Sequence, residues 1–325
     1  MECHGLRPLA GGFQNHVYAW DDPDHGPICI KLYAKGNHRR RVDREWAALT
    51  LLAEHGVRGV PRPLWLNSNE NVPAIGMTLL NGTPLLDSAD HQAALRGLAH
   101  TTRRLQQVPL SGLLADLERV DSVPRYMKRL TGSWPALLAD DEDGPLTPAM
   151  RALLTAWHDS GDAELLSQTT APGVFSRGDS NLLNWLRDGD TSPCVDFEYS
   201  GHSTKVFDAA DLIEHISARE IPDSTWIVLL PDLGVTPGDR HLFLAAQRTC
   251  ALRWLAVLWK QRRIRTAEFD AQHARVRLLQ RHDNLEQRPR RWPGHRPPPR
   301  PPGGGERRFM LVAKQALNPP RAFTK

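Results

Sequence analysis

The sequence contains few cysteines and no long hydrophobic run. Its four cysteines form no C-x-x-C pair and no disulfide-framework spacing, which favours free thiols in a reducing compartment. No window approaches the roughly 18 consecutive apolar residues that a bilayer-spanning helix needs. The amino-terminal segment MECHGLRPLAGG also lacks the basic and apolar regions of a secretory signal. We therefore expect a cytoplasmic protein with no membrane partner.

Charge of both signs is present in ordinary amounts, but it is distributed unevenly. Hydrophobic residues make up 40% and charged residues 24% of the 325 residues, which excludes a disordered chain and is typical of a soluble globular protein. The formal net charge is +4, yet residues 286–325 contain ten Lys and Arg and two Glu, a net +8. The other residues therefore carry a net −4, so the basic balance says little about what the folded part binds.

Three segments are expected along the chain. The turn residues Asn81-Gly82-Thr83-Pro84 mark a boundary between residues 1–81 and residues 82–287. Residues 288–325 contain RRWPGHRPPPRPPGGGERR, where proline removes backbone donors and glycine adds chain entropy, so we predict disorder. We interpret this tail as a solvated extension. Contact of the tail with nucleic acid, an acidic membrane or an SH3-like partner is the alternative.

The first segment is predicted to contain a small antiparallel sheet and one helix. Alternation of apolar and polar residues in GGFQNHVYAW and again over 27–33 predicts a pair of strands. Apolar residues at three- to four-residue spacing predict a helix over 42–55, which Gly56 would end. A further strand is expected near 74–77.

Helical periodicity dominates the second segment. Helices are predicted over 88–107, 148–158, 206–218, 239–263 and 266–287. The exception is GVFSRGDSNLLNWLRDGDTSPCVDFEYSG, where short apolar pieces at 174–175, 182–186 and 194–197 predict strands and Asp188-Gly189-Asp190 predicts a turn. The sequence thus predicts an α+β fold with a small sheet-rich lobe followed by a larger, mainly helical lobe.

Three side chains in that exceptional segment carry the groups that phosphoryl transfer requires. Asp179 and Asn184 lie five positions apart, and Asp196 follows twelve positions later. A carboxylate must orient or deprotonate the attacking hydroxyl, and oxygen ligands must hold the Mg²⁺ that neutralises the triphosphate. Protein kinases place Asp and Asn at the same five-residue offset, with a metal-binding Asp in D-F-G downstream. The order R-G-D-S-N-L-L-N and then D-F-E therefore predicts a phosphotransferase.

The same residues resemble the aminoglycoside phosphotransferase and choline kinase superfamily, over about residues 8–285. Its members usually have H-G-D-x-x-x-x-N followed by a D-F-E or D-x-D context, and they share a protein-kinase-like bilobal fold. The resemblance implies ATP and Mg²⁺ as cofactors. It also implies that Asp179 is the catalytic base, that Asn184 and Asp196 are Mg²⁺ ligands and that Asp208 is a structural aspartate at a helix start.

Nucleotide-binding residues are expected in the first segment. A strand lysine must reach the phosphates and an acidic residue on the next helix must hold it, which suits Lys31 and Glu45. An exposed strand lysine is the alternative for Lys31. Gly12 and Asn15 would lie over the phosphates if their segment behaves like the nucleotide loop of the family, although it lacks G-x-G-x-x-G and an ordinary hairpin explains it equally well. Residues 77–80 resemble the linker whose backbone meets adenine.

Several positions near the motif depart from the family pattern or extend it. Arg177 stands where the family commonly has His, and Ser180 stands where Leu is frequent. The family His supports the catalytic loop, so we expect Arg177 to support the loop through a carboxylate, or else to inactivate the protein. In an extended segment Glu198 would face the same side as Asp196 and approach a second metal or the substrate; a solvated or hydrogen-bonded role is equally open.

The acceptor is expected to be a small molecule with a hydroxyl group. The acidic run 140–143, with Glu214 and Glu220, would attract a cationic acceptor such as an aminoglycoside or choline, although a solvated loop explains the run better. Trp254 and Trp259 would either bind a quaternary ammonium through cation–π contacts or pack in the core. Protein phosphorylation is disfavoured because no A-P-E element follows D-F-E. A nucleotide-binding pseudokinase without turnover is the alternative function.

Overall fold

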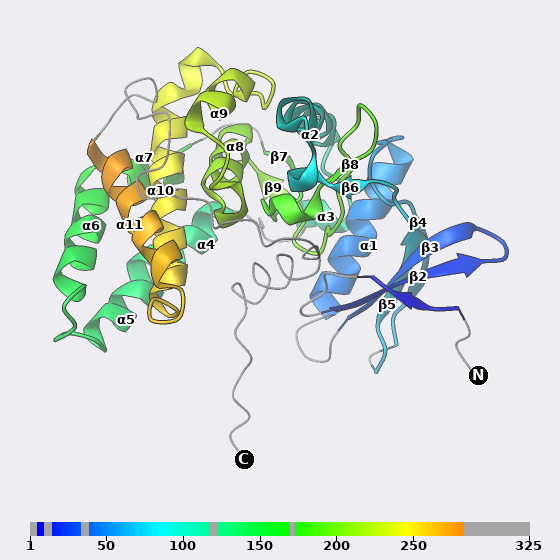
Figure 1. The fold of residues 1–325 in the computed structure, drawn as a ribbon, viewed down its shortest axis with the longest axis horizontal. Coiled ribbons are helices and arrows are strands. Elements are labelled where there is room, and N and C mark those ends of the chain that lie inside the picture. Colours follow the sequence, from blue (N-terminus) through cyan, green and yellow to red (C-terminus); the bar gives the residue numbers. More distant parts are fainter. Residues whose placement is uncertain are drawn as a thin grey trace.

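A computed structural model shows how the chain folds (Figure 1). It has a small part built on a sheet and a larger helical part that lies beside it. The structure describes residues 5–9, 15–33, 39–69, 71–116, 122–169 and 173–281. The sheet lies at one end of the molecule, and the helices within residues 134–159 and 240–281 lie toward the other. The predicted α+β architecture is confirmed.

A five-stranded antiparallel sheet forms the first part. Its strands, in spatial order, are β1 (Arg7–Pro8), β2 (Asn15–Asp22), β3 (Gly26–Tyr33), β5 (Ala74–Thr78) and β4 (Pro63–Asn67). The β2–β3 hairpin turns where the Asp22 carboxylate accepts hydrogen bonds of 2.9 Å from the backbone N–H groups of Asp24 and His25. The predicted pair of strands and the strand near 74–77 are confirmed. β4 was not predicted, because its PLWLN sequence starts with proline and does not alternate.

Helix α1 (Arg39–Glu54) packs against β4 and β5. Val42, Leu49 and Leu52 recur at helical spacing and are buried, as the sequence predicts. Glu45 lies on the same buried face, one turn from Val42, and is only 1% exposed. The helix therefore brings one carboxylate into the interior, and such a group needs a partner there.

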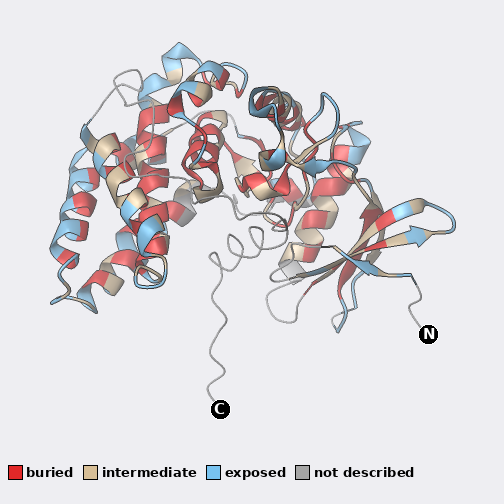
Figure 2. Ribbon diagram, in the orientation of Figure 1, coloured by how far each residue is buried: buried red, intermediate tan, exposed pale blue. Residues whose placement is uncertain are grey.

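Within the described residues, the larger part contains ten helices: α2 (His91–Gln106), α3 (Leu113–Asp116), α4 (Ser122–Lys128), α5 (Trp134–Ala139), α6 (Thr147–Asp159), α7 (Asp162–Ser167), α8 (Lys205–Glu214), α9 (Asp223–Leu229), α10 (Arg240–Trp259) and α11 (Thr266–Arg281). A π turn over Arg129–Ser133 joins α4 to α5. α10 is buried along most of its length, and α7, α8 and α11 pack around it (Figure 2). Among the described residues, no helix is both long enough and hydrophobic enough to cross a bilayer.

The helix boundaries differ from the predicted ones for local reasons. α2 begins at His91 rather than at 88, because the Asp90 carboxylate accepts a hydrogen bond from the Ala93 N–H and caps the helix. The helix predicted over 206–218 ends at Glu214, and a 3-10 turn over Ile216–Ala218 follows. α10 ends at Trp259, four residues before the predicted end. The short helices α3, α4, α5, α7 and α9 were not predicted, because such lengths give little periodicity.

The segment 173–201 contains less strand than the sequence predicts. β7 (Val174–Ser176) pairs with β9 (Gly201–Ser203), and β8 (Leu186–Arg187) pairs with β6 (Thr83–Pro84). The piece expected as a strand over 182–186 begins as a 3-10 turn, which the Asn181 side chain caps by accepting from the Leu183 N–H. The piece expected over 194–197 forms only one isolated bridge, between Cys194 and Trp185.

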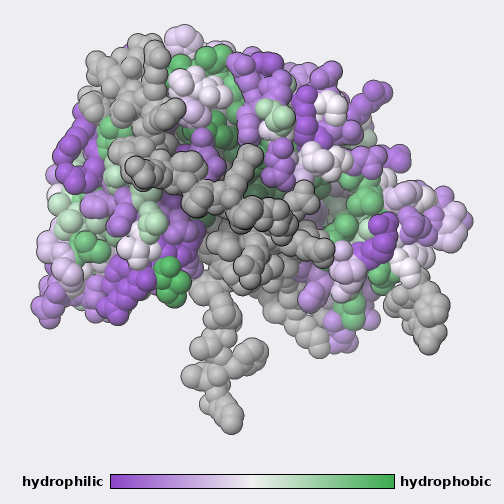
Figure 3. Space-filling model, viewed as in Figure 1, coloured by the Kyte–Doolittle hydropathy of each residue, from purple (hydrophilic) through white to green (hydrophobic). Residues whose placement is uncertain are grey.

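Two clusters of buried apolar residues form the core. One cluster runs from α1 and the sheet through α2 to α8 and α9, and it includes Leu49, Leu95 and Phe207. It therefore joins the sheet to the helical part. The second cluster lies among α5, α6, α10 and α11, with Trp157 and Phe269 as members. On the face drawn in Figure 3, the hydrophobic residues that reach the surface form separate patches between hydrophilic ones.

A buried ion cluster links three of these helices. The Arg275 guanidinium on α11 lies 2.6 Å from a Glu214 carboxylate oxygen on α8 and 2.7 Å from an Asp223 carboxylate oxygen on α9. The Glu214 carboxylate also accepts a 2.6 Å hydrogen bond from the Gln247 amide of α10. Arg275 is 2% exposed, so its charge depends on these two partners.

Replacing Arg275 by Leu is expected to lower the free energy of unfolding by about 3–5 kcal/mol, because Glu214 and Asp223 then remain buried without a cation. Urea denaturation measures the change. Arg277→Leu, at an exposed position of the same helix, is the control and is expected to change stability by less than about 0.5 kcal/mol. Equal effects of the two substitutions would contradict this account of the cluster.

Candidate functional site

A cavity of about 650 Å³ lies between the sheet and the helical part. Its lining includes six residues that the sequence analysis selected: Asn15, Lys31, Glu45, Asp179, Asn184 and Asp196. Residues 77–80, the predicted linker, line it as well. Gly12 lies outside the described residues. Side chains separated by up to 181 positions in the sequence thus meet around one space.

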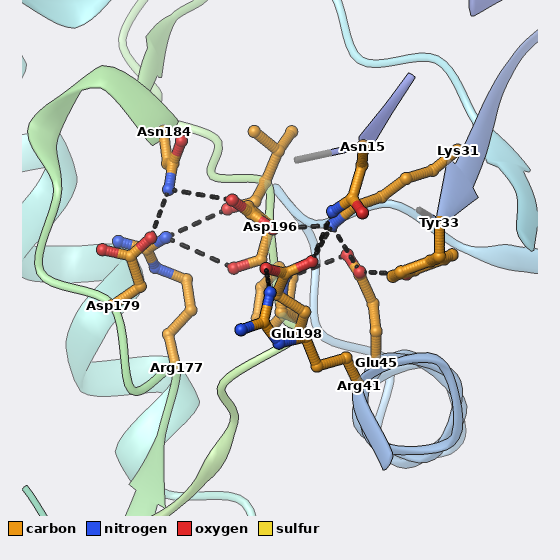
Figure 4. Close-up of polar contacts among 12 residues, drawn as sticks. Asn15, Lys31, Tyr33, Arg41, Glu45, Arg177, Asp179, Asn184, Asp196 and Glu198 are labelled. Carbon is orange, nitrogen blue, oxygen red and sulfur yellow. Dashed lines mark hydrogen bonds and ion pairs between the residues drawn. The ribbon is translucent and has the colours of Figure 1, made fainter. Parts of the chain in front are cut away.

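Lys31 lies at the centre of a group of carboxylates (Figure 4). Its Nζ is 2.6 Å from Glu45 Oε2, 2.6 Å from Asp196 Oδ1 and 3.2 Å from Glu198 Oε2. Lys31 is only 6% exposed, which excludes the alternative of an exposed strand lysine. Burial by itself lowers the pKa of Lys31, but Asp196 and Glu45 raise it further, and the net result is a pKa well above the usual lysine value. The side chain is therefore a permanent cation.

Glu45 is held by more than the lysine. One carboxylate oxygen accepts a hydrogen bond from the Phe197 backbone N–H at 3.0 Å, and the other accepts from the Tyr33 hydroxyl as well as from Lys31. Burial, followed by the Glu45 charge, raises the pKa of Tyr33 well above its usual value, so the phenol stays a donor. These contacts fix the position of the Glu45 carboxylate and, through it, the Lys31 ammonium.

Glu198 contacts residues that precede and follow β3. Its Oε2 accepts a 2.6 Å hydrogen bond from the Asn15 amide of β2, and its Oε1 lies 3.5 Å from the Arg41 guanidinium of α1. Glu198 is 5% exposed, and burial raises the pKa of its carboxyl. Of the alternatives that the sequence left open, the hydrogen-bonded one describes Glu198 in this structure.

Asp179 and Asn184 lie away from α1, and Asp196 lies between Asn184 and Lys31 (Figure 4). The Asn184 amide nitrogen lies 2.8 Å from Asp179 Oδ2 and 3.4 Å from Asp196 Oδ2. The other oxygen of Asp179 accepts a 2.9 Å hydrogen bond from the Asn181 N–H. Asn184 therefore contacts both of the other residues selected from the motif.

Backbone conformation explains how Asp196 and Glu198 both reach Lys31. Asp196 has φ +71°, the one positive φ of a non-glycine residue in the described chain. The extended conformation expected here is wrong, because this left-handed residue bends the segment. A strained backbone of this kind persists only where its surroundings enforce it, and here both its side chain and its carbonyl are engaged.

Arg177 supports the loop in a way the sequence did not predict. Its guanidinium donates hydrogen bonds to the backbone carbonyls of Val195 at 3.0 Å and of Asp196 and Asn181 at 3.5 Å. It also lies over the Trp185 ring, 5.5 Å from the centroid. The prediction that Arg177 pairs with a carboxylate is wrong, because its hydrogen-bond acceptors are backbone carbonyls. Arg177 therefore joins the segment that carries Asp179 to the segment that carries Asp196.

Glycine is required immediately before Asp179. Gly178 has φ +69°, and a Cβ atom at this position would lie 2.0 Å from the Tyr199 carbonyl oxygen. Because that oxygen belongs to the backbone, a side chain here would force the loop away from the segment 196–199. The close approach keeps Asp179 beside Asp196.

His215 was missed by the sequence analysis, since no spacing rule connects it to the motif. Its Nδ1 accepts a 3.1 Å hydrogen bond from the Ser217 N–H, and the Ser217 hydroxyl, 2.7 Å from Nδ1, accepts a 2.9 Å bond from the Leu182 N–H. This chain of contacts holds the 3-10 turn that follows Asp179. Burial lowers the pKa of His215 to about 3, so the imidazole is neutral and Nδ1 is free to accept.

The other acidic residues considered from the sequence lie outside the cavity lining. Asp141 pairs with Arg262 at 2.6 Å, and Glu142 pairs with Arg151 at 3.3 Å. Glu214 belongs to the Arg275 cluster. Asp208 lies in the first turn of α8 and accepts a 2.9 Å hydrogen bond from the Ser176 hydroxyl, next to the loop.

The aromatic residues considered with them divide between cavity and core. Trp254 lines the cavity, whereas Trp259 packs in the second hydrophobic cluster.

Oxygen ligands suited to Mg²⁺ are present at Asp196 and Asn184. Mg²⁺ prefers carboxylate and amide oxygens over nitrogen. The assignment of amide oxygen and nitrogen in Asn184 follows from its hydrogen-bond partners, and rotation by 180° presents the oxygen to the same space. Glu45, Asp196 and Glu198 also form a compact carboxylate group, but the Lys31 ammonium already lies among them. Asn184 and Asp196 therefore fit a magnesium ion better.

Comparison with known proteins identifies the family. The sequence model of the Phosphotransferase enzyme family matches residues 5–230, and the chain belongs to that family. No curated protein sequence matches significantly.

Solved structures share the fold, which is protein-kinase-like. A choline/ethanolamine kinase family protein from Mesorhizobium loti is similar with a TM-score of 0.58 and 19% identity, covering 86% of this chain and 89% of that one. An APH(2″) enzyme solved with GDP and kanamycin has a TM-score of 0.59 and 15% identity, covering 88% and 95%. A choline kinase from Cryptosporidium parvum has a TM-score of 0.57 and 12% identity, covering 85% and 88%.

Acid is expected to destabilise the protein through His215. The unfolded imidazole takes up a proton below its ordinary pKa near 6.5, whereas the folded one resists protonation down to about 3. Its contribution to the free energy of unfolding is complete above pH 6.5 and is lost as the pH falls, by about 2 kcal/mol at pH 5. Denaturation of the wild type and of His215→Gln at pH 7.5 and pH 5 measures this loss, which the variant should lack. The same loss in both proteins would contradict the assignment.

Proposed function

We propose that the protein is an ATP-dependent phosphotransferase that moves the γ-phosphate to a hydroxyl group of a small molecule. The observation that carries the proposal is the meeting of Lys31, Asp179, Asn184 and Asp196 around one cavity. Membership of the phosphotransferase family supports it. Phosphoryl transfer depends mainly on placement and charge stabilisation, for which these groups are suited.

Lys31 contacts the α- and β-phosphates of the nucleotide in this proposal. Its ammonium is fixed by Glu45, which is itself held by Tyr33 and by the Phe197 N–H. A lysine positioned in advance loses little entropy when the nucleotide binds. Asn15, at the start of β2, contacts the phosphates in this proposal, whereas Gly12, which was expected beside it, lies outside the described residues. The Asn15 amide would exchange its Glu198 contact for a phosphate oxygen.

Asn184 and Asp196 hold Mg²⁺ in this proposal. The ion would supply charge neutralisation for the phosphate groups. The cavity supports its binding, because three carboxylates surround the single Lys31 ammonium and leave an excess of negative charge. Asn184 also touches Asp179, so it sets the distance between the metal ligands and the base.

Asp179 aligns the acceptor hydroxyl. Its Oδ1 is oriented by the Asn181 N–H, which leaves Oδ2 directed toward Asn184 and the cavity. The acceptor oxygen forms a bond to the γ-phosphorus, the bond from that phosphorus to the β,γ-bridging oxygen breaks, and ADP leaves. The hydroxyl proton goes to the Asp179 carboxylate. No covalent enzyme intermediate is needed.

A nucleotide-binding pseudokinase is the second candidate function, because Arg177 replaces the usual His. The contacts of Arg177 favour the active enzyme, since its guanidinium joins the Asp179 and Asp196 segments through backbone carbonyls. Binding of nucleotide without turnover would be the mark of the pseudokinase.

Asp179→Asn is expected to lower kcat for phosphate transfer by about 10²–10⁴-fold, because the amide cannot accept the hydroxyl proton. The affinity for the magnesium–ATP complex should stay within about threefold, since Asp179 is not placed among its ligands. Labelled ATP with an acceptor library, or the slow hydrolysis of ATP, provides the assay. Asp190→Asn, in the exposed turn of the same segment, is the control. Nucleotide binding without any turnover in the wild type would contradict the proposal.

Lys31→Met is expected to weaken binding of the magnesium–ATP complex by about 10- to 100-fold, equivalent to about 1.5–3 kcal/mol for a hydrogen bond to a charged group. Calorimetry measures the affinity, and thermal unfolding verifies that the variant folds. Lys205→Met, at the first residue of α8 and outside the cavity lining, is the control. An unchanged affinity in Lys31→Met would show that the nucleotide binds elsewhere.

A further inference from the structure

The helical side of the cavity has its own set of lining residues. They are Tyr126, Arg129, Asp211, His215, Arg253 and Trp254, from α4, the π turn, α8 and α10 and the link after α8. This side is next to Asp179 and Ser180, which line the same cavity. An acceptor whose hydroxyl reaches Asp179 therefore contacts these residues. Their charges and hydrogen-bonding groups indicate which chemical class of acceptor fits.

Arg253 is a cation with no acidic partner in the part of the chain that the structure describes. Its guanidinium carbon lies 4.5 Å from the Tyr126 ring centroid and 4.1 Å from the Trp254 ring centroid, so two aromatic rings hold it. Among the described residues, no carboxylate forms an ion pair with it, and its buried Nη1 atom has no hydrogen-bond acceptor. A buried donor without an acceptor lowers stability, and more so when it is charged, so an acceptor from outside the chain is expected.

Trp254 offers a second donor without an acceptor. It is 3% exposed, and its indole Nε1 is buried with no hydrogen-bond partner in the described part of the chain. Trp254 follows Arg253 directly on α10, and both residues line the cavity. Two adjacent donors that lack acceptors point to a ligand rich in acceptor oxygens.

The aromatic rings of the cavity are already covered by cations of this chain. Of the described residues that line it, three carry Tyr or Trp rings: Tyr126, Tyr199 and Trp254. Arg253 lies over Tyr126 and Trp254, and Arg41 lies 5.0 Å from the Tyr199 centroid. A quaternary ammonium needs free aromatic faces, so this arrangement does not suit one.

The carboxylates of this side are also engaged. Asp211 accepts hydrogen bonds from the Tyr126 hydroxyl at 2.5 Å and from the Ser180 hydroxyl at 2.7 Å, and it is 4% exposed. Among the described residues, Asp179 is the other carboxylate on this side, and the proposed reaction uses it. The acidic run at 140–143 contributes nothing to the lining. A polycationic acceptor therefore finds little free negative charge here.

We infer that the acceptor carries an anionic group, a carboxylate or a phosphate, which binds the Arg253 guanidinium while its hydroxyl is presented to Asp179. The planar fork of arginine suits both anions, since two parallel N–H donors match two oxygens. The Trp254 N–H adds a third donor. This inference rests on the proposed phosphotransferase function, which supplies the reason for a hydroxyl at Asp179.

The test compares matched acceptors that differ in charge. Two sets of compounds are used, and the members of each set have the same carbon skeleton. The first set is glycerol, glycerate, glycerol 3-phosphate and 3-aminopropane-1,2-diol. The second set is glucitol, gluconate, glucitol 6-phosphate and glucamine. Binding to the full-length protein is measured by calorimetry with the nucleotide site saturated by a non-hydrolysable ATP analogue and Mg²⁺. The carboxylate or phosphate member is expected to bind at least tenfold more tightly than the neutral and amino members. The two anionic arms distinguish the carboxylate from the phosphate.

Substitution of Arg253 locates the anion. Arg253→Gln is expected to weaken the anionic compound at least tenfold, and Arg253→Lys is expected to lose part of that affinity because it keeps the charge and loses the fork. Arg151→Gln removes one positive charge at an exposed position of the same lobe and should leave the affinity unchanged. Thermal unfolding verifies that each variant is folded.

Two results would overturn the inference: tighter or equal binding of the neutral or amino compounds, or anion binding that Arg253→Gln leaves intact. Because binding is measured without turnover, the result is independent of the catalytic test. Absence of ATP turnover in the wild type, with anion binding intact, would instead refute the proposed function.

Discussion

The buried ammonium of Lys31 is the contact on which the site depends. It pairs with Glu45 on α1 and with Asp196 on the segment that follows β8, so one cation ties the sheet part to the helical part. Paired charges can persist in a protein interior, whereas an isolated one cannot. Because Glu45 also accepts the Phe197 N–H, the residues next to Asp196 are held by the same carboxylate. The position of the motif thus follows from charge pairing as well as from apolar packing.

The two ends of the cavity differ in charge. Around Lys31 three carboxylates face one ammonium and the Arg41 guanidinium, which leaves an excess of negative charge, so this end favours a further cation. At the helical end Arg253 has no acidic partner in the described chain and is held between two rings. A magnesium–nucleotide complex suits the first end and an anion-bearing acceptor suits the second. Asp179 lies where the two meet.

The sequence predicted the groups better than the contacts between them. Spacing identified Asp179, Asn184 and Asp196, because the chemistry demands those residue types in that order. The left-handed conformation of Asp196 was not predictable, since it depends on contacts made after folding. Arg177 was recognised as a departure, but its carbonyl partners lie up to 19 positions away. A binding role for Arg253 was not predicted. Nothing in a regular helical sequence identifies a residue that lies between two aromatic rings from different helices.

An experimental structure with Mg²⁺ and a non-hydrolysable ATP analogue tests the central claim most directly. The account predicts the Lys31 ammonium within hydrogen-bond distance of the α- and β-phosphates, with the ion bound to Asp196 and to the Asn184 amide oxygen. Asp179 should remain unliganded by the metal and face the γ-phosphate. Nucleotide bound away from Lys31, or an ion held by residues other than Asn184 and Asp196, would contradict it.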